Sequence, residues 1–127
     1  MSKKIIQTPH APAPIGPYSQ AVQVGNMLFT SGQIAIDPLT NTYEPASVEA
    51  VAELVMQNLK AVLEAAGCAF KDVAKTSIFL KSMDDFGAVN KVYSTYFTDQ
   101  FPARETVEVA CLPKSCKVEI SMIALVP

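Results

Sequence analysis

Two charged residues near the C-terminus have the types and spacing of a binding site. Arg104 follows a proline at the entrance of a strand-like run, residues 105–110, and Glu119 interrupts the apolar alternation of a second run, residues 117–126. A cation at the entrance of a strand and a carboxylate inside one are both costly to remove from water. An arginine presents a rigid fork that matches a carboxylate, and a glutamate can hold or deprotonate a water molecule. The pair therefore favours a site for a small anionic substrate.

The same spacing is equally consistent with a structural role for both residues. Arg104 and Glu119 can neutralise one another as an ion pair, or each can pair with another residue. No serine or cysteine has an identifiable base beside it, so covalent acyl chemistry is poorly supported. His10 is the single histidine, which excludes a histidine-based metal cluster and a Ser-His triad.

The three cysteines, Cys68, Cys111 and Cys116, indicate neither a disulfide framework nor a metal site. They are odd in number and contain no CxxC pair. Cys111 and Cys116 flank a turn signal, but two thiols without a further histidine or cysteine nearby are a weak zinc motif. We expect buried or half-buried free thiols and no bound metal.

The composition limits the class of protein. At 127 residues the chain is long enough for one domain, residues 1–127, with a sizeable core. Half of the residues are apolar and only 17% are charged, which favours a surface partly hidden in an oligomer. The net charge of −2 and the absence of a basic stripe disfavour a nucleic-acid partner. With no signal peptide and no apolar run of about 18 residues, we expect a soluble, cytoplasmic protein and no membrane contact.

The first half of the chain predicts an arm and a hairpin. Residues 8–17 contain four prolines, so they cannot form a helix or a central strand, and we expect an extended arm that packs over the domain. Strands are predicted over residues 21–24 and 27–33 around a Gly-Asn turn. The second strand ends at Ser31 and Gly32, where a backbone can approach a ligand closely, although a strand end or bulge is the simpler interpretation.

Two amphipathic helices are predicted, with a strand over residues 73–80 between them. The first covers residues 47–66, with Ser47 as its N-cap, and the second begins at Ser82 or Asp84 and reaches about Phe97. Asp84 and Asp85, at the start of the second helix, are explained by helix capping and by their interaction with the helix dipole. Apolar residues recur on one side of each helix at steps of three and four.

The alternation in the last strand indicates a missing partner. The even positions from Val118 to Val126 are all apolar and should face the helices, whereas the odd positions, Glu119 among them, form a second face. Two helices cover only one face of a sheet. We therefore expect a second copy of the chain on the other face, with the candidate site at an interface between subunits.

With these residues in view, the sequence resembles the RidA/YjgF family of reactive intermediate deaminases from Pro14 to the C-terminus. The matching motifs are Ile15–Ala21, Phe29–Ile34, Asn90 with Tyr93, Phe101–Arg104, Val109–Ala110 with Leu112–Lys114, and Val118–Ile120. In this order and at these spacings the motifs are highly specific.

The resemblance implies a fold, an assembly and an activity. The fold is a chorismate-mutase-like α+β domain, with two helices on one face of a mixed sheet, assembled as a homotrimer with clefts between subunits. Family members hydrolyse 2-imino acids and their enamine tautomers, such as 2-iminobutanoate and 2-iminopropanoate, to 2-keto acids and ammonia. They thereby protect pyridoxal-phosphate enzymes, and they need neither a metal nor an organic cofactor.

The resemblance also assigns roles to residues of this chain. Arg104 is implied to grip the substrate carboxylate and Glu119 to position the attacking water, with Tyr18 as a third catalytic residue. Further substrate-binding residues are implied in the same cleft: Ser31, Gly32, Thr106 and Asn90.

Two positions depart from the family pattern. Archetypal members have cysteine at position 106, where this chain has threonine, and many have arginine at position 111, where it has cysteine. A thiol at position 106 is therefore not required for an activity here, and the departures bear on substrate preference.

Two other functions remain open at this point. One is a single-strand endoribonuclease that inhibits translation, which the acidic composition disfavours. The other is a non-catalytic small-ligand-binding or chaperone-like module that uses the same cleft.

Overall fold

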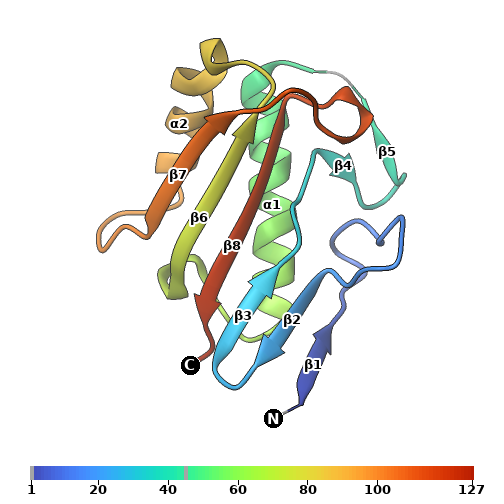
Figure 1. Cartoon of the computed structure of the whole chain (residues 1–127), viewed down its shortest axis with the longest axis vertical. Coiled ribbons are helices and arrows are strands. Elements are labelled where there is room, and N and C mark those ends of the chain that lie inside the picture. The colour runs from blue at the N-terminus through green and yellow to red at the C-terminus, as the bar shows by residue number, and fades with distance from the viewer. Residues whose placement is uncertain (1, 45) are drawn as a thin grey trace.

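Figure 1 shows the computed structural model of the chain, which describes residues 2–44 and 46–127. Within this part, a six-stranded sheet has two α-helices packed on one face, and a two-stranded hairpin lies beside it. The predicted α+β class is confirmed. The elements are β1 (Lys3–Ile6), β2 (Ala21–Val24), β3 (Met27–Thr30), β4 (Ile36–Asp37), β5 (Thr42–Tyr43), α1 (Val48–Ala65), β6 (Val73–Leu80), α2 (Phe86–Ser94), β7 (Ala103–Glu108) and β8 (Val118–Leu125).

The strand order of the main sheet is β1-β2-β3-β8-β6-β7. Neighbouring strands are antiparallel except for β6 and β7, which run parallel and are joined through α2. A parallel pair needs such a crossover. The last strand of the chain thus lies at the centre of the sheet, and β7 lies at an edge.

The predicted hairpin is confirmed, but its second strand is shorter than expected. Gly25 has a φ of 60° in the turn between β2 and β3. The strand β3 ends at Thr30 instead of residue 33, and its pairing with β8 shifts by one residue between Phe29–Ile123 and Gln33–Ile120. Gln33 then rejoins β8 through an isolated bridge to Ile120. The chain therefore leaves the sheet at Ser31 and Gly32.

Helix α1 lies behind the sheet along most of its length (Figure 1). The Ser47 hydroxyl accepts a hydrogen bond from the Ala50 backbone N–H at 3.2 Å, which confirms the predicted N-cap. Gly67 follows the helix with a φ of 78°, a conformation that favours glycine. The predicted apolar face is buried, and its members include Val51, Ala52, Val55, Met56, Leu59, Val62 and Leu63.

The second helix begins with a 3₁₀ turn, Met83–Asp85, capped by the Ser82 side chain. Helix α2 ends at Ser94 and does not reach Phe97. The hydroxyls of Ser94 and Thr95 donate to carbonyls of the preceding turn, at 2.8 Å and 2.7 Å. Such bonds compete with the helical ladder, and the helix ends there.

Strand β7 covers residues 103–108 instead of the predicted 105–110. It pairs in parallel with β6 from Lys75–Ala103 to Leu80–Glu108, and β6 ends at Leu80. The bounds of β7 therefore follow those of its partner, which no local pattern in its own residues reveals.

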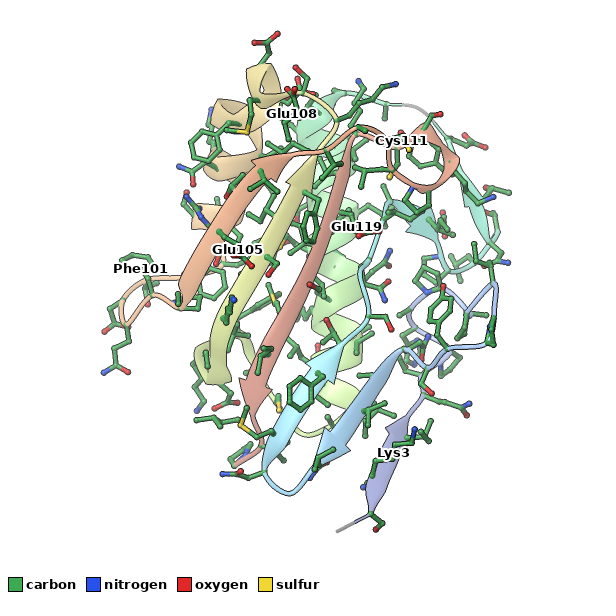
Figure 2. The ribbon with its side chains drawn as sticks, in the orientation of Figure 1. Lys3, Phe101, Glu105, Glu108, Cys111 and Glu119 are labelled. Atoms are coloured by element: carbon green, nitrogen blue, oxygen red, sulfur yellow. The ribbon has the colours of Figure 1, made fainter. Side chains whose placement is uncertain are left out.

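The predicted alternation in β8 is confirmed. Val118, Ile120, Met122 and Ala124 are buried against the helices, whereas the odd positions are partly or fully exposed. Phe29, Val107 and Leu125 are also 42–46% exposed. The described part of the chain places no helix over this open face, on which Figure 2 shows both Glu119 and Glu105.

Three short strands, β1, β4 and β5, were not predicted from the sequence. Cys68 and Cys116 are buried as expected, but Cys111 is exposed, because it lies in the irregular segment that follows β7. In residues 2–44 and 46–127, no helix is long and apolar enough to cross a membrane. The same residues contain no cluster of three potential metal ligands.

Candidate functional site

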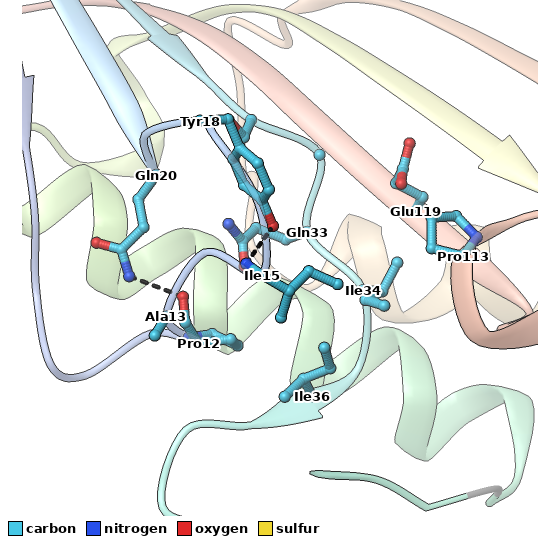
Figure 3. Close-up of a pocket in the computed structure, with 12 residues that line it drawn as sticks. Pro12, Ala13, Ile15, Tyr18, Gln20, Gln33, Ile34, Ile36, Pro113 and Glu119 are labelled. Carbon is cyan, nitrogen blue, oxygen red and sulfur yellow. Dashed lines mark hydrogen bonds between the residues drawn. The ribbon is translucent and has the colours of Figure 1, made fainter. Parts of the chain in front are cut away.

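A pocket of about 370 Å³ lies between the N-terminal arm, the chain after β3 and the start of β8 (Figure 3). Most of its walls are apolar, and Glu119 is the one carboxylate among the described lining residues. Three of the residues implied by the resemblance, Tyr18, Ser31 and Gly32, lie here with Glu119. The remaining lining residues are Pro12, Ala13, Ile15, Gln20, Gln33, Ile34, Ile36 and Pro113.

The Glu119 carboxylate is half-buried in this pocket. Among the described residues, no hydrogen-bond partner and no counter-ion lies within bonding distance of it. Burial raises the pKa of Glu119 above the ordinary 4.5. A desolvated carboxylate with a raised pKa is suited to take a proton from water near neutral pH.

Gly32 leaves the space that the Glu119 side chain occupies. A Cβ atom at position 32 would lie 2.7 Å from Cδ of Glu119, 2.8 Å from Oε2 and 2.9 Å from Cγ. These distances are shorter than van der Waals contact allows. The glycine therefore permits the close approach of the backbone to the carboxylate, and a larger residue would force the Glu119 side chain to move.

We expect Gly32→Ala to displace the Glu119 carboxylate and to lower catalytic activity by at least about tenfold, as a misplaced catalytic group does. The measurement is kcat together with the melting temperature. Gly87→Ala is the matched control, because among the described residues no atom outside its own stretch of α2 lies within 4 Å of its Cβ position. Equal activities of the two variants would contradict this role for Gly32.

Hydrogen bonds hold the two hydroxyl groups of the pocket. The Tyr18 hydroxyl accepts a bond from the backbone N–H of Ile15 at 3.4 Å, which leaves its own hydrogen available to donate. The Ser31 hydroxyl donates to the carbonyl oxygen of Ser19 at 2.5 Å. Tyr18 therefore presents a hydrogen-bond donor to the pocket, whereas the Ser31 hydroxyl links the segment after β3 to the end of the arm at Ser19.

Arg104 and Asn90 lie in a different hollow, of about 450 Å³, at the β7 edge of the sheet. An Arg104 side-chain nitrogen, Nη1, donates to Oδ1 of Asn90 at 2.6 Å. The guanidinium carbon lies 5.2 Å from the ring centre of Tyr93 and 5.5 Å from that of Phe86, which are cation–π distances. The guanidinium is thus oriented by α2, and its other N–H groups have no hydrogen-bond partner in the part of the chain that the structure describes.

Within one chain, Arg104 and Glu119 lie on opposite faces of the sheet. Arg104 pairs with Thr76, which is fully buried on the helix side, whereas Glu119 pairs with Phe79 on the open side. Successive residues of a strand point to opposite faces. The two residues therefore do not neutralise one another within the chain, and one chain does not unite them in one site.

Thr106 lies on the same face of β7 as Arg104, since it pairs with the buried Ile78. Its Oγ1 atom is buried, with no hydrogen-bond partner in the described part of the chain. A buried hydroxyl without a partner costs free energy. Thr106 lines neither of the two hollows that hold the other candidate residues.

Sequence reasoning missed the apolar walls of the pocket. The arm packs over the domain as expected, with Ala11 buried in the core, and it also contributes Pro12, Ala13 and Ile15 to the pocket beside Tyr18. This second role was not predicted, because it depends on the place where Ser31 and Gly32 leave the sheet. The small second cluster of apolar residues, Ile34, Ile36, Leu112 and Cys116, forms another part of this region.

Fold and site together define a small α+β domain with a carboxylate pocket on one side of its sheet and an oriented arginine on the other. Residues 8–126 match the family described as "Endoribonuclease L-PSP". The chain belongs to this family, which includes the RidA/YjgF proteins.

Among its relatives, the "2-iminobutanoate/2-iminopropanoate deaminase" of Escherichia coli is 50% identical over 96% of this chain and 97% of its own length. The mouse protein of the same name is 47% identical, over 97% and 91%. A "RutC family protein" of Synechocystis is 53% identical, over 100% and 99%. Relatives of this chain are thus named both as deaminases and only by family.

Solved structures confirm the fold. The YjgF gene product of E. coli has a TM-score of 0.91 at 50% identity, covering 96% of this chain and 98% of its own. The E. coli protein TdcF, solved with bound serine, has a TM-score of 0.91 at 44% identity, over 96% and 98%. A "putative endoribonuclease" of Thermotoga maritima has a TM-score of 0.93 at 52% identity, over 96% of both chains.

Proposed function

We propose that this protein hydrolyses reactive 2-imino acids and their enamine tautomers, 2-iminobutanoate and 2-iminopropanoate among them, to 2-keto acids and ammonia. The observation that carries the proposal is the Glu119 carboxylate, desolvated and without a counter-ion among the described residues, in an apolar pocket that also presents the Tyr18 hydroxyl. The names of the mouse and E. coli relatives support the same reaction.

The active unit in this proposal is a homotrimer with its sites between subunits. Arg104 and Glu119 face opposite sides of the sheet in one chain, so a site that uses both must take them from two chains. The open face carries Phe29, Val107 and Leu125, each more than two fifths exposed. Covering such residues favours association of copies of the chain.

Substrate binding then depends on residues from both sides of the cleft. Arg104 of one subunit holds the substrate carboxylate with two parallel hydrogen bonds, and Asn90 of the same subunit keeps the guanidinium in place. Thr106 lies two residues from Arg104 on the same face of β7, but its buried hydroxyl lines neither hollow, so this proposal gives it no contact with the substrate. Ser31 and Gly32 of the other subunit shape the wall beside Glu119.

The chemical step is addition of water to the C=N bond. Glu119 takes a proton from water while the oxygen bonds to the imine carbon, and the nitrogen receives a proton, for which the Tyr18 hydroxyl is a donor. Glu119 then returns its proton to the nitrogen while the C–N bond of the carbinolamine breaks, and the carbinolamine hydroxyl gives its proton back to the Tyr18 oxygen. Ammonia leaves, the 2-keto acid remains, and both side chains are restored. An imine is already electrophilic, so acid–base assistance of about 10²–10⁴-fold in rate is sufficient. No step uses a metal or an organic cofactor.

The biological role in this proposal is protective. Pyridoxal-phosphate enzymes such as threonine dehydratase release these unstable imines, which damage other enzymes of that class. We place the protein beside such enzymes in the cytoplasm.

The test generates 2-iminobutanoate with threonine dehydratase and traps the remaining imine with semicarbazide. Addition of the protein is expected to lower semicarbazone formation and to speed the release of 2-oxobutanoate and ammonia. If the protein leaves both rates unchanged, it is not an imine deaminase.

The family description favours one further candidate, a ribonuclease that acts on single-stranded RNA. The net charge of −2 argues against it, because RNA binding is dominated by contacts of cations with phosphates. RNA cleavage that survives both extensive purification and Arg104→Ala would support this candidate. Binding of 2-keto acids without turnover of imines would instead indicate a small-ligand-binding module.

A further inference from the structure

Gln20 is a buried glutamine whose side chain fastens the N-terminal arm. Only 4% of its surface is exposed. Its amide nitrogen lies 2.9 Å from the carbonyl oxygen of Pro12, 3.1 Å from that of Thr8 and 3.3 Å from that of Ala11. Its amide oxygen accepts the backbone N–H of Thr8 at 2.8 Å. One side chain therefore holds both ends of residues 8–12.

The arm depends on these side-chain hydrogen bonds because its own backbone cannot form those of a helix or a sheet. Proline has no backbone N–H, and four prolines fall within residues 8–17. The buried carbonyl groups of this segment still need donors. The backbone of Gln20 also accepts the N–H of Ser31 at 2.9 Å, so Gln20 ties the arm to the segment that bends at Gly32.

The fastened arm forms one wall of the candidate active site. Pro12, Ala13 and Ile15 line the pocket from the arm, and Figure 3 shows them on one side with Glu119 and Pro113 on the other. The pocket volume of about 370 Å³ is many times the share of one water molecule in the liquid, about 30 Å³. The space beside Glu119 is therefore large and apolar compared with the methyl or ethyl side chain of a small imino acid.

We propose that Gln20 is a positioning residue that sets the side-chain preference of the site. This inference rests on the proposed function. With the arm fastened, the wall formed by Pro12, Ala13 and Ile15 contacts the substrate side chain and favours bulky apolar 2-imino acids over small ones. Without the Gln20 amide the wall is no longer held at a fixed distance from Glu119, and this preference is lost.

The test compares the wild type with Gln20→Met and Gln20→Glu, which keep the side-chain length but lose the amide donors. An amino-acid oxidase supplies the imines of leucine and alanine, and the ratio of their kcat/KM values is measured. One methylene in an apolar pocket contributes about 10–200-fold, so we expect a wild-type ratio of at least about tenfold that falls towards unity in both variants. Gln23→Met is the matched control, because within residues 2–44 and 46–127 the Gln23 side chain bonds to the carbonyl of Gly25 and does not line the pocket.

Two further readouts separate this inference from the proposed function. Hydrogen exchange of the Thr8 amide should accelerate in both Gln20 variants. The wild type should bind 4-methyl-2-oxopentanoate more tightly than pyruvate, whereas in the Gln20 variants the two dissociation constants should become similar. This measurement needs no turnover. If the wild type binds these 2-keto acids with that difference but hydrolyses no imine, the proposed reaction fails and the role of Gln20 stands.

Two results would overturn the role of Gln20. One is an unchanged leucine-to-alanine ratio in the variants, including an equal loss for both substrates, which a merely structural residue would produce. The other is a wild-type preference for the smaller substrate.

Discussion

Arg104→Ala is expected to lower kcat/KM for 2-iminobutanoate by about 10²–10⁴-fold. A charge-assisted hydrogen bond contributes about 1.5–3 kcal/mol, and the variant removes two bonds to the substrate carboxylate. The loss should appear mainly in KM if the carboxylate is bound equally in the ground state and the transition state. Steady-state kinetics over a wide substrate range measures both constants.

Two further variants distinguish the contributions of the charge, the planar shape and the orientation of the Arg104 guanidinium. Arg104→Lys keeps the charge but not the planar fork, so we expect it to recover only part of the loss. Asn90→Ala keeps the guanidinium and removes the acceptor that lies 2.6 Å from Nη1, so its effect should be smaller than that of Arg104→Ala. If Arg104→Ala had wild-type kinetics, Arg104 would not be part of the substrate-binding site.

Glu119→Gln is expected to lower kcat by about 10²–10⁴-fold with little change in KM, because it removes the base and not a contact to the substrate carboxylate. Glutamine has the same shape, so the close packing against Gly32 is preserved. Circular dichroism and melting temperature serve as controls for folding. A variant with wild-type kcat would show that Glu119 is not the base.

The pH dependence of kcat provides an independent measurement on Glu119. Burial raises the pKa of this carboxyl above 4.5, and the base must be ionised to accept a proton. As the pH falls, kcat should therefore decline through an apparent pKa above 4.5, and this decline should be absent from the residual activity of Glu119→Gln. A decline centred below 4.5 would contradict the assignment.

The alternation of apolar residues along β8 was enough to predict the face of the sheet on which Glu119 lies. The alternation from Val118 to Ala124 identified the helix-facing side of β8, and the structure buries those even positions as predicted. Helix α1 was equally predictable, because its apolar face, its Ser47 cap and its terminal glycine agree with one another. Strong local patterns thus determined the central layers of the fold.

The position of Arg104 was not predictable in the same way. Strand β7, with the sequence Ala-Arg-Glu-Thr-Val-Glu, has no apolar face that would reveal its orientation. Its orientation and bounds come from parallel pairing with β6, a contact between segments distant in sequence. The sequence therefore singled out two candidate charged residues but did not reveal their placement on opposite faces.

The contribution of the arm to the pocket was not predictable for a related reason. Its prolines correctly excluded regular structure, but its place over the pocket depends on the buried amide of Gln20 and on the bend at Gly32. The motif that contains Gln20 was visible in the sequence, yet a glutamine in a motif does not reveal which carbonyl groups it bonds. Such contacts become apparent only when the folded chain brings the arm beside β3.

Mixing of Arg104→Ala and Glu119→Gln subunits tests most directly whether the two residues meet across a subunit interface. Each variant alone should be nearly inactive. In trimers assembled at random from equal amounts of both, about a quarter of the interfaces should combine an intact Arg104 with an intact Glu119 from the neighbouring chain. We predict recovery of about that fraction of wild-type activity, whereas mixed trimers no more active than either variant alone would contradict a site shared between two chains.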